Sequence, residues 1–170
     1  GTDWRSRFPL VNESWQQLDR LNIGRGQAFG AVHLRRGDYL KVSSRVVGLA
    51  EVGSLLMMIR RMLPKTLIFV SDSVLTSNDR ETITRILPEH DCCFPQLDEP
   101  HTLHGILRLA QTLVTSNSTF SWTAGLLRER ADSVVLSPQH FFGWEKPSEN
   151  ARFQASSDWM FVRPPHSLRD

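Results

Sequence analysis

Two adjacent arginines follow an apolar run near the start of the chain, in the segment AVHLRRGDYL of residues 31–40. The apolar residues predict a buried strand, and His33, Arg35, Arg36 and Asp38 stand where that strand ends. An arginine stays charged at physiological pH, and its planar fork binds phosphate through two hydrogen bonds. The arginine pair therefore suits a diphosphate. Alternatively, the two side chains pair with Asp38 and a neighbouring acid on a solvated loop.

Two further polar clusters also follow apolar runs. Ser71, Asp72 and Ser73 end one of these runs, and Ser-Asn-Ser-Thr at residues 116–119 ends another and precedes a helical pattern. The second cluster offers hydroxyls, an amide and free backbone N–H groups at the positive end of a helix. It therefore predicts an anion site.

The elements that position these clusters alternate between short apolar runs and amphipathic segments. Predicted strands cover residues 28–34, 66–71, 91–94, 112–116 and 133–137, and predicted helices cover residues 51–63, 77–87, 101–111 and 120–130. This alternation predicts an α/β fold, a Rossmann-like parallel sheet with helices on both faces. Ligands of such sheets bind outside the carboxyl ends of the strands, where all three clusters fall.

The ends of the chain flank this predicted core domain of residues 28–143. Residues 1–27 form a leading segment with a helix over residues 12–22, for which Asn12 is the expected N-cap. Residues 144–170 are expected to form a polar, proline-containing tail.

Composition excludes several classes of protein. The 170 residues are 40% hydrophobic and carry a net charge of +2, which is too small to argue for nucleic acid binding. No apolar run is long enough for a membrane span, and no targeting segment is evident. Cys92 and Cys93, the only cysteines, exclude a disulfide framework. A zinc site that includes His90 is an alternative, but small strand residues are the favoured interpretation.

The two strongest polar segments resemble a known enzyme family. HLRRGDYL (residues 33–40) and SNSTFSWTAGLL (residues 116–127) are similar to the two main signatures of the alpha-1,2-fucosyltransferases of glycosyltransferase family 11, and their order matches. FVSDS (residues 69–73) and SPQHFFGWE (residues 137–145) resemble two weaker elements of that family. The chain differs from the family pattern at Ser73 and near Leu103, where acids are expected, and at Thr123, where a tryptophan is expected.

This resemblance implies a GT-B enzyme, in which two Rossmann-like domains face each other and the later domain binds the nucleotide sugar. Such enzymes transfer fucose from GDP-fucose to an acceptor hydroxyl with inversion and need no divalent metal. Only 27 residues precede the first predicted strand, so the chain is expected to be the donor-binding half. The expected partners are GDP-fucose, a galactose-type glycan acceptor and an upstream acceptor-binding domain outside this chain.

The resemblance also assigns roles to residues. Arg36 is expected to contact the β-phosphate, with Arg35 assisting it or fixing the loop. Asp38 either pairs with an arginine or acts as general base, and Asp72 either binds ribose or guanine or caps a helix. The expected catalytic residues are Arg36 and Asp38, and the expected GDP-fucose ligands are His33, Arg35, Arg36, Asp72, Asn117, Ser118, Thr119, Phe120 and Ser121.

Two other classes of function compete with fucosyl transfer. One is a nucleotide-binding module without transfer activity. The other is adhesion through the tripeptide of residues 36–38, Arg-Gly-Asp, although the buried strand before it disfavours the exposed loop tip that such recognition needs. The compartment stays open between the cytoplasm of a bacterium and the Golgi lumen of a eukaryote.

Overall fold

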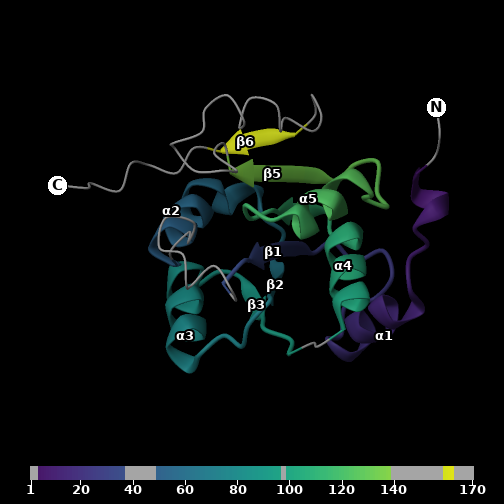
Figure 1. Cartoon of the computed structure of the whole chain (residues 1–170). Helices are drawn as coiled ribbons and strands as arrows, with labels where there is room; N and C mark the ends of the chain where they lie inside the picture. The colour runs from purple at the N-terminus through teal and green to yellow at the C-terminus, as the bar shows by residue number, and fades with distance from the viewer. Residues whose placement is uncertain (1–3, 37–48, 97–98, 139–158, 163–170) are drawn as a thin grey trace.

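Six parallel strands form one sheet at the centre of the computed structural model, which describes residues 4–36, 49–96, 99–138 and 159–162 (Figure 1). The strand order is β3-β2-β1-β4-β5-β6. The strands are β1 (Gly30–Leu34), β2 (Thr66–Ser71), β3 (Asp91–Cys93), β4 (Thr112–Val114), β5 (Val134–Pro138) and β6 (Met160–Val162). This is the strand order of a doubly wound Rossmann sheet. The predicted Rossmann-like α/β fold is confirmed.

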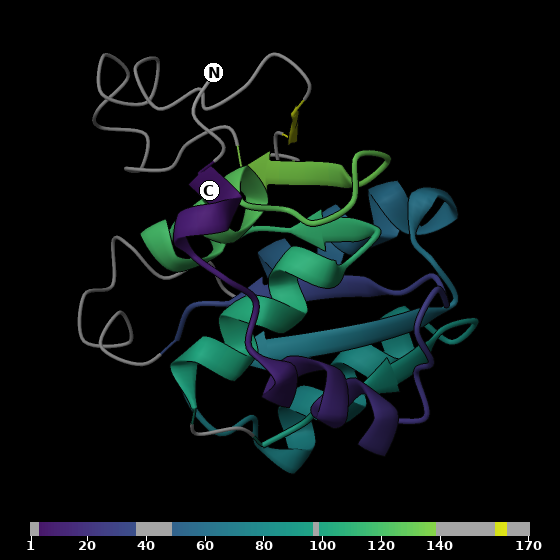
Figure 2. The same cartoon turned by 90° about the vertical axis from the view of Figure 1, so that its right-hand side faces the viewer.

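Helices cover both faces of this sheet (Figures 1 and 2). The α-helices of the described ranges are α1 (Asn12–Arg20), α2 (Leu49–Ile59), α3 (Ser77–Ile86), α4 (Pro100–Leu109) and α5 (Thr119–Leu126), and the same ranges include the short 3-10 helices η1 (Trp4–Arg7) and η4 (Arg60–Met62). Successive side chains of a strand point to opposite faces of the sheet, so β1 contributes to the hydrophobic core on each face. Ala31 packs with the core under α1, α4 and α5, whereas Val32 packs with the core under α2 and α3. None of the described helices has the length and apolar character needed to span a membrane.

The leading helix α1 is packed against α4. The Ser14 hydroxyl donates to the Thr102 carbonyl over 3.1 Å, and Leu18 is fully buried. A Cβ atom on Gly105 would lie only 2.0 Å from the Ser14 hydroxyl oxygen, so this contact needs glycine. The expected cap is wrong, because Asn12 is the first helical residue and Val11 is the N-cap, without a side-chain capping bond.

The segment expected to be a polar tail contributes a strand. Residues 160–162 pair in parallel with β5, with Ser137 opposite Phe161. Trp159, just before this strand, is 5% exposed and lies edge-on to Trp122. A Cβ atom on Gly125 would lie 2.8 Å from the Trp159 ring, so α5 approaches the strand closely at this glycine. A three-residue strand is too short to show period-two alternation, which is why the sequence pattern missed it.

Candidate functional site

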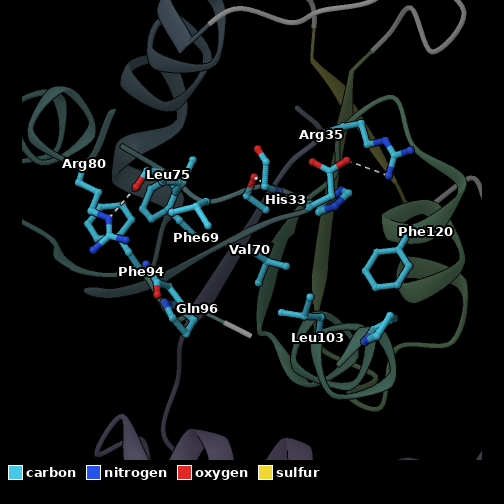
Figure 3. A pocket seen from close by; sticks show the side chains of 16 residues that line it. His33, Arg35, Phe69, Val70, Leu75, Arg80, Phe94, Gln96, Leu103 and Phe120 are labelled. Atoms are coloured by element: carbon cyan, nitrogen blue, oxygen red, sulfur yellow. Dashed lines mark hydrogen bonds and ion pairs between the residues drawn. The ribbon is translucent and has the colours of Figure 1, made fainter. Parts of the chain in front are cut away.

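The direction of strand order reverses between β1 and β4, and the carboxyl ends of these two strands meet there. This position is the usual ligand-binding crevice of a doubly wound sheet. A pocket of about 480 Å³ opens beside it, across the ends of β1, β2 and β3 (Figure 3). Arg35 and Phe120 lie on one side of the pocket, Arg80 and Phe94 lie on the other, and His33 lies between them (Figure 3).

A contact between His33 and Ser116 brings together the two segments that resemble family signatures, residues 33–40 and 116–127. His33 Nδ1 lies 2.8 Å from Ser116 Oγ, although the residues are 83 positions apart in the sequence. His33 is 4% exposed, and its ring lies 5.5 Å from the Phe120 ring, centroid to centroid. Burial, with further contributions from Arg35 and His104, outweighs the attraction of Asp72 and lowers the pKa of His33 from 6.5 to about 4. The imidazole is therefore neutral at physiological pH.

Asp72 holds the arginine loop from the end of β2. One carboxylate oxygen accepts the Arg36 backbone N–H over 2.7 Å, and the other forms an ion pair with Arg35 Nη1 at 2.9 Å. The alternative expectation that Asp72 caps a helix is wrong, because the following helix α3 has Thr76 as its N-cap. Arg35 and Asp72 both line the pocket.

Arg36 points to a different acid. Arg36 Nη1 forms an ion pair at 2.9 Å with Asp79, whose side chain is 8% exposed. Asp79 also completes the capping box of α3, since it accepts the Thr76 N–H and donates its own N–H to the Thr76 hydroxyl. Burial raises the pKa of Asp79, but the hydrogen bonds from Arg36 and Thr76 outweigh this effect and leave the pKa below its usual value. Arg36 is not among the residues that line the pocket.

The pairing of both arginines agrees with the alternative that these cations pair with acids, and the partners within the described residues include Asp72 and Asp79. Asp38, the expected partner and candidate base, lies outside the described residues, as does Gly37 of the Arg-Gly-Asp tripeptide. The sequence interpretation missed Asp79. The three-residue spacing from Thr76 to Asp79 is a helix-start signal that could have drawn attention to it.

The serine-rich segment forms the start of α5. Ser118 is the N-cap and accepts the Phe120 N–H over 3.3 Å, so the helix begins at Thr119, one residue before the expected start. Ser121 Oγ accepts the Ser116 N–H over 3.2 Å and donates to the Ser118 carbonyl over 3.3 Å. Asn117, Ser118 and Ser121 are buried, whereas Thr119 is exposed. Hydrogen bonds from its own hydroxyls therefore stabilise the conformation of this segment. Contacts from these residues to a substrate stay a prediction.

The far end of the pocket is largely apolar. Phe94 stacks on Phe69 with ring centroids 5.2 Å apart, and the Arg80 guanidinium carbon lies 5.9 Å from the Phe94 centroid. Gln96 also lines the pocket at this end, whereas Leu103 lines it on the side of Phe120 (Figure 3). This end suits a flat aromatic group with few polar contacts.

The chain differs from the family pattern at three positions, Ser73, Leu103 and Thr123, and the first two line the pocket. Leu103 is buried and lines the pocket where an acid is expected. Thr123, in place of a tryptophan, forms a hydrogen bond of 3.1 Å with His104 Nε2. Burial, Arg108 and His101 lower the pKa of His104 to about 4. The sequence interpretation did not single out His104, whose ring lies edge-on to Phe120 at 5.2 Å between centroids.

The cysteines lie on β3 as free thiols. Burial, together with Cys93 and Asp91, raises the pKa of Cys92 to about 11, so this thiol is protonated at neutral pH. Within the described ranges no three His, Cys, Asp or Glu side chains are grouped as metal ligands would be.

Fold and site together define a Rossmann-like domain with a pocket at the carboxyl ends of its strands, where the ligands of doubly wound sheets bind. No protein-family profile matches the chain, and no curated protein sequence matches it. Among solved structures, the fold is similar to that of POFUT1 in complex with GDP-fucose, with a TM-score of 0.55 and 17% sequence identity over 71% of this chain. The match spans 43% of the POFUT1 chain. At 17% sequence identity, the structural similarity to POFUT1 supports the fold of this chain alone.

Proposed function

We propose that this chain is the donor-binding half of a glycosyltransferase that transfers fucose from GDP-fucose to a galactose-type hydroxyl of a glycan. The observation that carries the proposal is the bond between His33 and Ser116, which brings the two signature-like segments together beside a pocket at the reversal of strand order. The similar fold of POFUT1, whose structure contains GDP-fucose, supports the choice of donor.

The diphosphate would lie between Arg35 and the start of α5. Arg35 is the pocket-lining arginine, and its guanidinium is held by Asp72 at 2.9 Å. The α5 N-terminus adds backbone N–H groups and the positive end of a helix dipole. The geometry favours Arg35 over Arg36 for the main phosphate contact, because Arg36 is engaged by buried Asp79.

The nucleoside would extend from the phosphates toward β3. Neighbouring strands lie about 4.8 Å apart, so the step from β1 to β3 covers roughly 10 Å. This distance suits the reach of a nucleoside from its phosphates to its base. Phe94 would contact the base, and Asp72, which pairs with Arg35 at 2.9 Å and also lines the pocket, offers a carboxylate that a ribose hydroxyl could meet.

Transfer with inversion needs charge stabilisation on the departing GDP and an acceptor hydroxyl on the opposite face of the fucose. Arg35 and the N–H groups of α5 would stabilise that charge without a metal ion. An upstream domain would supply the acceptor site, in keeping with the 43% of POFUT1 that this chain spans. Asp38 stays the candidate base.

Calorimetric titration with GDP, GDP-fucose, GDP-mannose and UDP tests this proposal, each in EDTA and then with Mg²⁺ or Mn²⁺. Binding of GDP and GDP-fucose in EDTA, tighter than that of UDP, is the expected result. Binding that requires a divalent cation would overturn the proposed metal independence. Failure of every nucleotide to bind would overturn the proposed function.

A further inference from the structure

Arg80 lines the pocket at the end opposite to Arg35 (Figure 3). Its Nε donates to the Leu75 carbonyl over 3.1 Å, and its guanidinium carbon lies 5.9 Å from the Phe94 ring centroid, within the range of a cation–π contact. Arg80 is the fourth residue of α3, and its backbone N–H donates to the Thr76 carbonyl over 3.1 Å. The helix start and the side-chain contacts therefore restrict the orientation of this guanidinium.

The two pocket-lining arginines differ in their charge partners. Arg35 pairs with Asp72 at 2.9 Å, whereas among the described residues no carboxylate forms an ion pair with Arg80. An arginine stays charged at physiological pH, and its Nη1 and Nη2 groups each carry two N–H donors. Because the Leu75 carbonyl engages only Nε, these terminal groups stay available to an acceptor in the pocket.

The spacing of the Nη1 and Nη2 donors suits a pair of acceptors on a base. Guanine presents O6 and N7 side by side, and arginine binds this pair through two parallel hydrogen bonds in nucleic-acid complexes. Adenine has an amino group in place of O6, and uracil has an N–H group beside its O4. An arginine fork of restricted orientation therefore favours guanine over adenine and uracil.

We infer that Arg80 is a specificity-determining residue that donates through Nη1 and Nη2 to O6 and N7 of guanine. The inference rests on the proposed function, which places a nucleoside diphosphate in this pocket with its base toward β3. Phe94 follows β3 and stacks on Phe69 with ring centroids 5.2 Å apart, so the apolar surface beside the Arg80 guanidinium is held in place as well. The base then meets Phe94 and two directed donors, while the phosphates meet Arg35 at the other end of the pocket.

Calorimetric titration of the wild-type chain with GDP and with 7-deaza-GDP, in which a C–H group replaces N7, tests this inference. The expected result is that 7-deaza-GDP binds about tenfold more weakly than GDP, because one hydrogen bond from Arg80 is lost. ADP should bind more weakly still, since its amino group faces the same donors. Equal affinities for GDP and 7-deaza-GDP would overturn the inference and leave the proposed function intact.

Replacement of Arg80 by methionine connects this discrimination to the residue. Methionine retains an unbranched side chain that packs on Phe94 but has no donor. Arg80→Met should therefore bind GDP at least about tenfold more weakly than the wild-type chain and should bind GDP and 7-deaza-GDP with equal affinity. Arg85→Met is the matched control, because Arg85 is exposed on the same helix and is not among the described residues that line the pocket. It should keep the wild-type affinities for both nucleotides.

A loss of affinity in Arg80→Met by the same factor for GDP, 7-deaza-GDP and UDP would overturn the inference, because Arg80 would then act on the phosphates or on the fold. If Arg80→Met does not fold, the wild-type comparison of GDP with 7-deaza-GDP decides the question. Failure of the wild-type chain to bind any of these nucleotides would overturn the proposed function, and the inference with it.

Discussion

Replacement of Arg35 by lysine distinguishes the contribution of this residue to GDP binding from its contribution to the free energy of unfolding. Arg35 pairs with Asp72 at 2.9 Å, and the two side chains are 28% and 21% exposed. A partly exposed pair of this kind contributes about 0.2–1 kcal/mol, and lysine retains the charge, so the free energy of unfolding should change little. Lysine loses the planar fork, however. Loss of a charged hydrogen bond to the β-phosphate costs about 1.5–3 kcal/mol, which corresponds to roughly 10- to 150-fold weaker GDP binding.

Calorimetry with GDP and GMP measures this effect. Arg35→Lys should weaken GDP far more than GMP, because GMP lacks the β-phosphate. Arg36→Lys is the matched control, since Arg36 pairs with buried Asp79 and should affect unfolding more than GDP affinity. The reasoning is refuted if Arg36→Lys selectively weakens GDP while Arg35→Lys does not, which is the outcome the sequence alone favours. Equal weakening of both nucleotides by Arg35→Lys would move this residue away from the β-phosphate.

Three further predictions concern stability and turnover. Asp79→Asn should destabilise the fold by about 1–3 kcal/mol in urea unfolding, whereas the exposed Asn78→Ala should have little effect. The folded-state pKa of His33 is about 4 against 6.5 when unfolded, so the unfolded chain binds the extra proton between these pH values. His33 should therefore lower the stability by about 3 kcal/mol as the pH drops through that window, in addition to the contribution of His104, whose pKa is also about 4, and His33→Asn should remove the His33 contribution. The 170-residue chain alone should transfer fucose very slowly, because acceptor positioning, worth about 7–11 kcal/mol, needs another domain. Turnover near ~1 per second would contradict this last prediction.

Much of the fold is predictable from local patterns. The run TLIFVS of residues 66–71 is β2 itself, because a central parallel strand is buried on both faces and reads as a continuous apolar run. Strand β6 was not predicted, because its three residues form a strand only by pairing with β5. Asn12 has the right residue type for an N-cap, but α1 begins one residue earlier than that role requires.

Some features of the candidate site are also predictable from the local sequence, and others are not. Ser118 as the start of a helix and His33 at a strand end follow from local chemistry. The partners of the arginines do not, because Asp79 is 43 residues from Arg36 and meets it only when α3 packs near the end of β1. The difference between Arg35 and Arg36 therefore depends on tertiary structure, since the two are identical and adjacent in the sequence.

A crystal structure of the chain bound to GDP-fucose tests the central claim most directly. The account predicts that the diphosphate lies at the carboxyl ends of β1 and β4, with Arg35 and the N-terminus of α5 as its ligands. The base should lie against Phe94. A diphosphate bound elsewhere, or bound at this edge without contact to Arg35, would contradict the account.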